Sequence, residues 1–439
     1  MNTACGGNGM TSRGISRRGF GKGAVAAGIG AVLGGTAAGA PSAAAAPEWR
    51  ATGTAVSALA GFDETMRAFM RERDVSAGQL AVTYQGRLVL ARGYAWTDDA
   101  ALDVQPTSLF RLASLSKPIT GAAVARLVQE GGLDLSAPIG SLVDLEPPSG
   151  GSADPRLGDV TIRRLLHHLG GWDRASTPDP MFRNFAISDA LGVPLPIGME
   201  HVIRHTTGLP LDHDPGTAYA YSNYGYLLLG RAIEAVTGTD YPSYVQDEVL
   251  GPVGISRMRL GRSAAADAAP TEVPYRSQNT GTTVLDGSGA TVPGPYGTFN
   301  LENMDSHGGW IGSAVDLVRF ATIFDTPAAT PVLNGTSISR VFAEPETGIG
   351  SGGSYYGFGW SVRPVASGGT GRNTWHTGGL TGTSTLLVRT YNGMSWAALF
   401  NQRDDPSGLS YGTIDPLLWE ASRDVASWPS GDRFPDYFG

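Results

Sequence analysis

Strand patterns near both ends of the 439-residue chain constrain its fold more than any other feature. Near the N-terminus, the β-prone segments 80–84 and 88–92 are separated only by Gln85-Gly86-Arg87, which predicts a β-hairpin. Near the C-terminus, segments 384–390 and 395–400 flank Asn392-Gly393, a dipeptide that accepts the positive φ of a type I′ turn. Both ends therefore contribute strands, and we expect them to meet in one antiparallel sheet.

Helical patterns lie between and beside these strands, which predicts an α/β fold. The expected helices span residues 61–73, 118–129, 224–237, 314–324 and 414–423, whereas residues 262–300 show no clear period. The economical architecture is a sheet domain built from residues 47–144 and 311–439 and covered by the first and last helices. A mostly helical region, residues 145–310, is inserted into it. We expect a ligand in the cleft between the two parts.

The first 46 residues have the features of an export signal. Ser16-Arg17-Arg18-Gly19-Phe20 is a twin-arginine signature, and an apolar, Gly/Ala-rich run and a stretch of small residues follow it. A flexible basic tail or a membrane anchor are the alternatives, but the apolar run is too short and too rich in glycine for a stable span. We expect a secreted or periplasmic protein without a stable membrane anchor.

Removal of this segment changes the charge and the chemistry that remain. The segment contains four basic residues and no acidic ones, so the rest of the chain has 28 basic and 40 acidic residues and a net charge of −12. This charge argues against a nucleic-acid partner. The single cysteine, Cys5, also leaves, so thiol catalysis is excluded. Of the two lysines in the chain, only Lys117 remains.

This lysine stands in the first sequence pattern that carries chemistry, Ser114-Leu115-Ser116-Lys117-Pro118. Proline suits the first turn of a helix, so Ser114 is expected at or just before the helix N-terminus, where developing negative charge is favoured. Lys117, three residues on, lies on the same helix face. A lysine at its usual pKa cannot take a proton from serine at neutral pH, but a desolvated lysine can. The alternative is a capping serine beside a surface lysine.

Two further patterns supply polar groups of the kind that such a serine needs. In Tyr221-Ser222-Asn223, the phenol can shuttle a proton and the amide can hold the lysine or a substrate carbonyl. In His376-Thr377-Gly378-Gly379, on an expected edge strand, the Gly379 N–H can join the Ser114 N–H as an oxyanion hole. The alternatives are a core tyrosine before a helix cap, and a Gly-rich turn.

Taken together and in this order, the three patterns resemble the serine β-lactamase-related family. That family holds class C β-lactamases, DD-peptidases, D-aminopeptidases and family VIII carboxylesterases, and the resemblance covers residues 60–420. The matching segments are Phe110-Arg111-Leu112-Ala113-Ser114-Leu115-Ser116-Lys117, Tyr219-Ala220-Tyr221-Ser222-Asn223-Tyr224-Gly225-Tyr226 and His376-Thr377-Gly378. The resemblance implies a β-lactamase/DD-peptidase-like fold. It also implies an acylated nucleophile at Ser114, general bases at Lys117 and Tyr221, and an orienting amide at Asn223.

The third segment departs from the lactamase pattern, because His376 stands where class C β-lactamases usually have lysine. A histidine is mostly neutral at pH 7, so this change weakens the lactamase reading and favours a peptide or ester substrate. An arginine such as Arg372 is one candidate for the missing charge. We therefore expect hydrolysis of D-amino-acid peptides or small esters. A class C-type β-lactamase and a penicillin-binding protein with little turnover are the rivals.

Other candidate sites are set aside. His167-His168 and the pair His201/His205 lack further ligands at metal-binding spacing, so no metal and no cofactor are expected. Ser384 lacks the second glycine of a nucleophile elbow and is predicted to lie in a strand. The expected binding partner is a small-molecule or peptide substrate, and the oligomeric state is left open.

Overall fold

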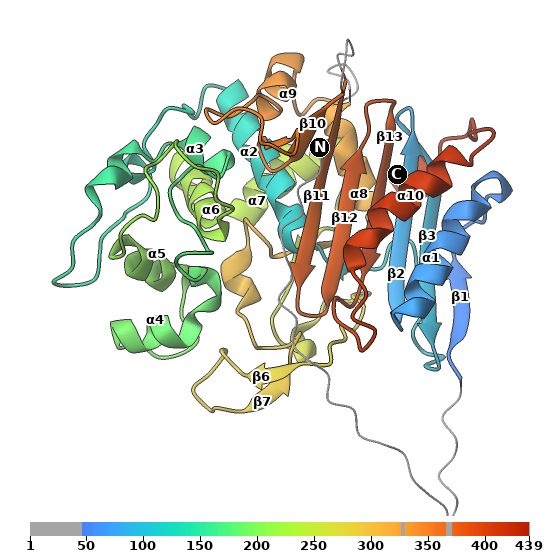
Figure 1. Cartoon of the computed structure of the whole chain (residues 1–439), viewed down its shortest axis with the longest axis horizontal. Coiled ribbons are helices and arrows are strands. Elements are labelled where there is room, and N and C mark those ends of the chain that lie inside the picture. The colour runs from blue at the N-terminus through green and yellow to red at the C-terminus, as the bar shows by residue number, and fades with distance from the viewer. Residues whose placement is uncertain (1–45, 326–329, 366–370, 439) are drawn as a thin grey trace, which may run out of the picture. The chain divides into compact units, whose positions relative to one another are not determined.

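The computed structural model describes residues 46–325, 330–365 and 371–438, and the export-signal prediction lies outside them except for Ala46. Figure 1 shows a mixed α/β fold in which a large sheet stands beside a helical region. The strands are β1 (Glu48–Thr52), β2 (Ala77–Tyr84), β3 (Arg87–Thr97), β4 (Phe110–Arg111), β5 (Arg259–Leu260), β6 (Thr280–Thr282), β7 (Thr291–Pro293), β8 (Trp310–Gly312), β9 (Tyr355–Tyr356), β10 (Ser361–Pro364), β11 (Arg372–Leu380), β12 (Thr383–Arg389) and β13 (Met394–Phe400). The helices are α1 (Ala60–Glu72), α2 (Ser116–Gln129), α3 (Ile162–Leu166), α4 (Asn184–Leu191), α5 (Met199–Thr207), α6 (Asn223–Thr237), α7 (Tyr241–Val245), α8 (Ala314–Ala321), α9 (Gly335–Val341) and α10 (Ile414–Arg423).

The main sheet joins both ends of the chain, as the sequence predicts. Its eight strands run in the order β1-β3-β2-β13-β12-β11-β10-β9, and every pairing is antiparallel. The two predicted hairpins, β2–β3 and β12–β13, are adjacent because β13 pairs with β2, with Ala397 opposite Ala81. The predicted antiparallel sheet is therefore confirmed.

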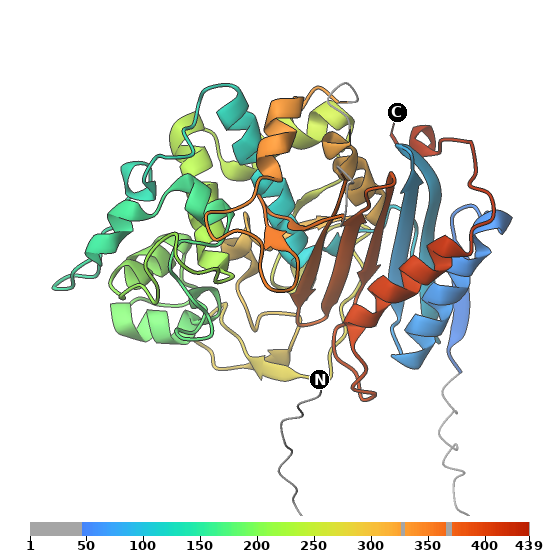
Figure 2. The same cartoon turned by 45° about the horizontal axis from the view of Figure 1, so that its top comes forward.

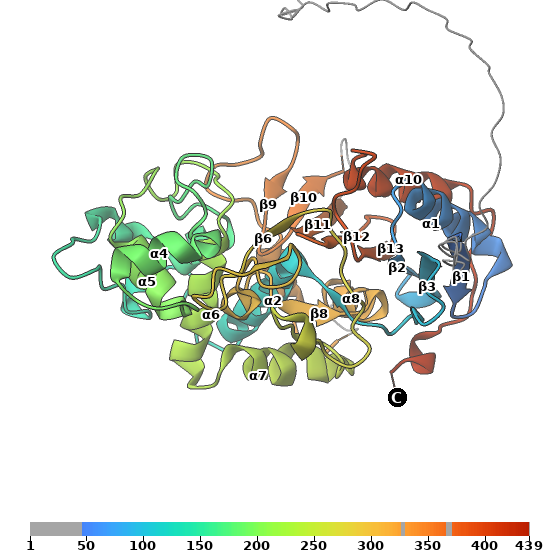
Figure 3. The same cartoon turned by 90° about the horizontal axis from the view of Figure 1, so that it is seen from below.

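Helices cover both faces of this sheet. Figures 1 and 2 show α1 and α10 crossing one face side by side, and Figure 3 shows α8 on the opposite face. A hydrophobic core lies on each face of the sheet, and alternate residues of β12 contribute to one core or the other. Leu386 and Val388 pack under α1 and α10, whereas Leu387 packs in the core on the opposite face. Strands buried on both faces have nearly continuous apolar sequences, and the Ser395–Phe400 part of β13 is one of these.

The strand that carries the third pattern is not at the edge of the sheet as predicted. β10 and β9 lie beyond β11, so the edge-strand prediction is wrong for β11 as a whole. However, β10 pairs only with the first four residues of β11, up to Trp375. Residues 376–380 pair with β12 alone, so the half of the strand that contains Gly378 and Gly379 keeps one open side.

The middle of the chain supplies α3 to α7 and the short strands. Figure 1 places α4, α5 and α6 away from the main sheet, while α2 runs between the helical region and the strands. β6 and β7 form a small hairpin inside residues 262–300, where no strand was predicted, because three-residue strands are too short to show alternation. Among the described residues, no helix is long and apolar enough to cross a membrane.

Candidate active site

Ser114 lies in a tight turn that ends the short strand β4 and starts α2. Ala113–Leu115 form a 3-10 turn, and α2 begins at Ser116, two residues before the predicted start. Ala113 has φ +49°, in the left-handed region that disfavours a side chain, and this strain fixes the direction of the next residue. The turn is held by bonds to its neighbours: Leu112 N–H donates to the Trp310 carbonyl at 2.8 Å.

Lys117 is buried one turn further on, with its amine against Ser114. Its Nζ lies 3.2 Å from Ser114 Oγ, 2.7 Å from Asn223 Oδ1 and 2.8 Å from the His307 carbonyl oxygen. The side chain has no exposed surface. Burial lowers the pKa of Lys117 well below its usual value, and the nearby charge of Asp179 only partly opposes this shift. A neutral amine is thereby favoured next to the hydroxyl.

Asn223 comes from the first turn of α6 and connects Lys117 to an acidic group. Ser222 caps this helix by accepting the Gly225 N–H at 3.1 Å, which fixes the position of Asn223. The Asn223 Nδ2 donates to Asp179 Oδ2 at 2.7 Å, while its Oδ1 faces Lys117. Because Asp179 holds the amide nitrogen, the amide oxygen must point to the lysine.

Tyr221 lies across the lysine, so the second pattern and the first meet. Lys117 Nζ is 4.8 Å from the centroid of the Tyr221 ring. Burial raises the pKa of Tyr221 above its usual value, and its contact with the Ser114 hydroxyl lowers it by less. On the other side, the His168 ring lies tilted against Tyr221, with ring centroids 4.4 Å apart, and the Arg174 guanidinium lies 4.7 Å from the centroid of the Tyr221 ring. Tyr221 therefore remains a protonated phenol at neutral pH.

His376 is buried behind the open half of β11. Its Nδ1 donates to the Thr377 carbonyl at 2.7 Å, so its Nε2 accepts the Tyr356 hydroxyl at 2.8 Å. Burial lowers the pKa of His376 to about 3, with Lys117 as a smaller cause. The histidine is consequently neutral, and both of its ring nitrogens are occupied by protein groups.

The two glycines of the third pattern face opposite sides of β11. A Cβ on Gly378 would collide with Thr385 Oγ1 and with the carbonyl oxygen of Leu112, two residues before the nucleophile. The strand can therefore pack against the Ser114 turn only because residue 378 is glycine. Gly379 faces the other side, toward Arg403.

This packing gives a direct test. Gly378→Ala is expected to lower kcat/KM by about 10²-fold, because the new methyl group must push the Leu112–Ser114 turn away from β11. Gly158→Ala is the matched control, since a Cβ on Gly158 meets no atom within 4 Å. Full activity in a folded Gly378→Ala variant would contradict the close approach of strand and turn.

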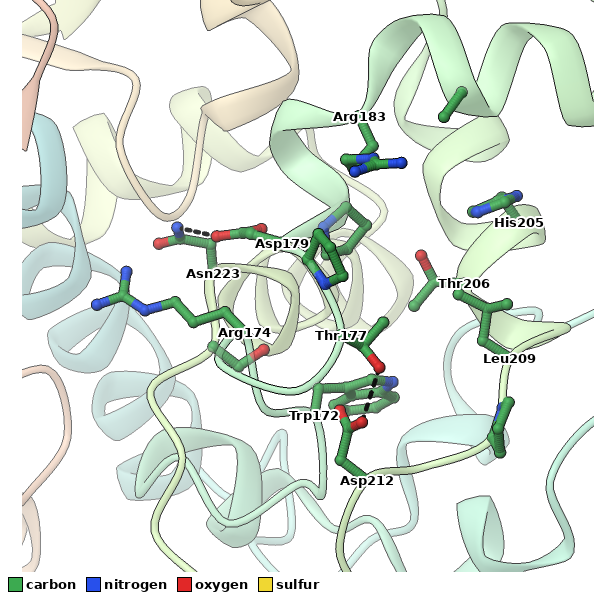
Figure 4. Close-up of a pocket in the computed structure, with 15 residues that line it drawn as sticks. Trp172, Arg174, Thr177, Asp179, Arg183, His205, Thr206, Leu209, Asp212 and Asn223 are labelled. Carbon is green, nitrogen blue, oxygen red and sulfur yellow. Dashed lines mark hydrogen bonds between the residues drawn. The ribbon is translucent and has the colours of Figure 1, made fainter.

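A pocket opens beside Asn223. Its volume is about 190 Å³, and Trp172 and Leu209 are among its apolar lining residues. Figure 4 shows Asn223 and Asp179 on one side and His205 and Leu209 on the opposite side. The Trp172 ring both packs on Tyr224, at 4.8 Å between ring centroids, and lines the pocket.

Three residues of this site were missed or misjudged from the sequence. Asp179 has no motif around it, and it reaches Asn223 from a loop 44 residues earlier. Tyr356 comes from β9, a two-residue strand that shows no periodicity. His168 was considered from the sequence only as a metal ligand; its ring packs against Tyr221, Tyr226 and Tyr356, and its Nδ1 accepts the Ser222 N–H at 3.2 Å. Across the described residues, no group of three or more metal-ligating side chains is found.

Comparisons with known proteins agree on the family. The β-lactamase family model matches residues 62–413. Esterase EstB of Burkholderia gladioli is 27% identical over 385 residues, covering 80% of this chain and 95% of the esterase. A probable fimbrial assembly protein, FimD of Dichelobacter nodosus, is 33% identical over 267 residues, and the match spans only 58% of its length. The D-amino acid amidase of Ochrobactrum anthropi shares the fold, with TM-score 0.62, 18% identity and coverage of 85% of this chain and all of the amidase.

Proposed function

This chain belongs to the β-lactamase family, and we propose that it is a serine hydrolase that forms an acyl-enzyme on Ser114. The proposed substrates are peptides that end in D-residues, or small esters. One observation carries the proposal: the buried Lys117 amine lies 3.2 Å from Ser114 Oγ and is surrounded otherwise by acceptors. Its two other neighbours are the Asn223 and His307 carbonyl oxygens, which accept but cannot donate.

The three oxygen neighbours of the Lys117 amine account for its proposed role as a base. A neutral amine has two N–H bonds and one lone pair. The Asn223 and His307 oxygens accept hydrogen bonds from the two N–H groups, so the lone pair of the amine points at the third neighbour, the Ser114 hydroxyl. Lys117 then takes the hydroxyl proton while Ser114 Oγ forms a bond to the substrate carbonyl carbon. In our proposal, the N–H groups of Ser114 and Gly379 donate hydrogen bonds that stabilise the negative charge on the carbonyl oxygen.

In the second half of the proposed reaction, the two candidate bases, Lys117 and Tyr221, have different roles. Tyr221 keeps its proton because burial raises its pKa, so it acts as the acid rather than as the base. Its hydroxyl gives a proton to the leaving nitrogen or oxygen as the scissile bond breaks, and Lys117 returns a proton to Tyr221. Water then attacks the ester on Ser114, and the acid product leaves with the serine hydroxyl restored.

The third pattern and the similar proteins support the proposed substrate classes. The buried, neutral His376 supplies no cation there, which separates this site from the usual lactamase pattern. An esterase and a D-amino acid amidase are among the proteins that this chain resembles, and they support the choice of ester and D-peptide. A β-lactamase and a slowly turning penicillin-binding protein use the same acylation step and remain alternatives.

The test is a parallel assay of the folded protein on N-acetyl-D-alanyl-D-alanine, p-nitrophenyl acetate and nitrocefin. Steady turnover of the peptide or the ester, with little turnover of nitrocefin, is the expected result. A stoichiometric burst followed by almost no turnover would instead support the penicillin-binding alternative. Preferred hydrolysis of nitrocefin would support the lactamase. The absence of acylation by all three compounds would contradict the proposal.

A further inference from the structure

His168 is a buried histidine of the site that takes no part in the proposed reaction. It lies in the turn that follows α3, and only 1% of its surface is exposed. Its backbone has φ +59°, in the left-handed region that few residues other than glycine adopt. Such a conformation persists only where the surrounding contacts hold it. Two of the contacts that hold His168 are made with the segment around Tyr221.

These two contacts lie on either side of Tyr221. The backbone carbonyl of His168 accepts the Ala220 N–H at 3.0 Å. The ring Nδ1 of the same residue accepts the Ser222 N–H at 3.2 Å. One histidine therefore holds the backbone both before and after Tyr221.

The imidazole ring also contacts the side chain of Tyr221. The centroids of the two rings are 4.4 Å apart, and the His168 ring lies equally close to Tyr356, at 4.3 Å. The Lys117 amine lies 4.8 Å from the centroid of the Tyr221 ring. Contacts with His168 and with Lys117 thus set the direction of the phenol, whereas the backbone contacts set its starting point.

The protonation state of His168 indicates that it acts through position. Because Nδ1 accepts a hydrogen bond, the ring proton of the neutral imidazole is on Nε2. Burial lowers the pKa of His168 well below its usual value, and Lys117 lowers it further, so the ring is neutral at neutral pH. Across the described residues, Nε2 has no hydrogen-bond partner. In that part of the chain no protein group is therefore placed to exchange a proton with His168.

We propose that His168 is a positioning residue that holds the Tyr221 hydroxyl where it can protonate the leaving group. This inference rests on the proposed function, in which Tyr221 is the acid, and it predicts which substrates depend on His168. An amine or an alkoxide is a strong base and needs a proton as the scissile bond breaks, whereas p-nitrophenolate leaves as a stable anion. Peptides and alkyl esters are therefore expected to depend on His168 more than p-nitrophenyl esters do.

The experiment compares N-acetyl-D-alanyl-D-alanine with the p-nitrophenyl ester of N-acetyl-D-alanine, because both form the same acyl-enzyme. We expect His168→Leu to lower kcat/KM by about 10²-fold for the peptide and by less than about tenfold for the ester. His168→Asn is expected to recover part of the peptide activity, since its side-chain oxygen can accept the Ser222 N–H and asparagine tolerates a positive φ. Equal losses for the two substrates would overturn the inference. If wild type cleaves only esters, the benzyl ester of N-acetyl-D-alanine replaces the peptide.

His201→Leu is the matched control. The Nδ1 of His201 also accepts a backbone N–H, that of Gly198 at 3.0 Å, but His201 lies at the start of α5 and does not line the pocket beside Asn223. We expect His201→Leu to leave the ratio of peptide to ester kcat/KM unchanged. The same selective loss in His201→Leu would show that the ratio does not report the position of Tyr221, and the inference would fail.

Hydrogen exchange separates this inference from the proposed reaction. If wild type turns over none of these substrates, the proposed function fails, and exchange of the Ser222 amide still tests the role of His168. Mass spectrometry of fragments spanning residues 219–223 is expected to show faster exchange in His168→Leu than in wild type, and slower exchange in His168→Asn than in His168→Leu. Because leucine disfavours a positive φ, His168→Gly replaces His168→Leu if the latter does not fold. Unchanged exchange in the folded variant that lacks the imidazole would contradict the inference.

Discussion

Ser114→Ala is expected to abolish covalent labelling of the protein by a fluorophosphonate or a penicillin, and to lower kcat by about 10⁶-fold. The reason is that the variant has no oxygen to attack the carbonyl, whereas the Lys117 amine and the Gly379 strand remain in place. Mass spectrometry of the labelled protein measures the first effect, and hydrolysis of the best substrate measures the second.

The matched control for labelling is Ser384→Ala. Ser384 lies on β12 opposite Gly379, and the sequence raised it only as a weak alternative nucleophile. A fluorophosphonate label is expected to persist in this variant, since no described hydrogen bond joins Ser384 to Lys117. A label that survives in Ser114→Ala, or disappears in Ser384→Ala, would mean that another residue is acylated.

The sequence predicts the long elements well because their patterns are local. The helix expected at residues 414–423 matches α10, and the Asn392-Gly393 turn joins β12 to β13. The start of α2 differs by two residues, because the 3-10 turn before it runs directly into the helix. Proline is tolerated inside the first turn, where N–H groups need no helical acceptor, so Pro118 marks that turn without fixing its first residue.

The site is only partly predictable for the same reason. Ser114 and Lys117 are three residues apart on one helical segment, so their proximity follows from helix geometry. The contact between Lys117 and Asn223 spans 106 residues, and only the resemblance to a family placed these two motifs together. Asp179 comes from a loop whose conformation depends on tertiary packing, and no local pattern indicates it.

Lys117→Ala is expected to lower kcat/KM by up to about 10⁴-fold while the protein stays folded. The variant loses the lone pair that faces Ser114 Oγ, and Asn223 Oδ1 and the His307 carbonyl lose their donor. Circular dichroism checks the fold, and rates on the best substrate check the activity. Because the methyl group leaves a cavity, a second variant is needed to separate loss of the base from loss of packing.

Lys117→Arg is that variant, since arginine supplies a positive charge and hydrogen-bond donors but is not deprotonated in proteins. If Lys117 acts as a base, this variant is as inactive as Lys117→Ala; if it acts only as a cation or as a donor, activity is partly restored.

The pH profile of the wild-type enzyme gives the same distinction. Burial lowers the pKa of Lys117, and only the neutral amine is active, so kcat/KM must rise as pH increases through that lowered pKa and level off above it. His376, with a pKa of about 3, and His167, with a pKa of about 4, are already neutral at neutral pH, so a rise in kcat/KM near or above neutral pH does not come from them. A profile that falls with increasing pH would show that the charged lysine is the active form, and the proton would then have to leave Ser114 by another group.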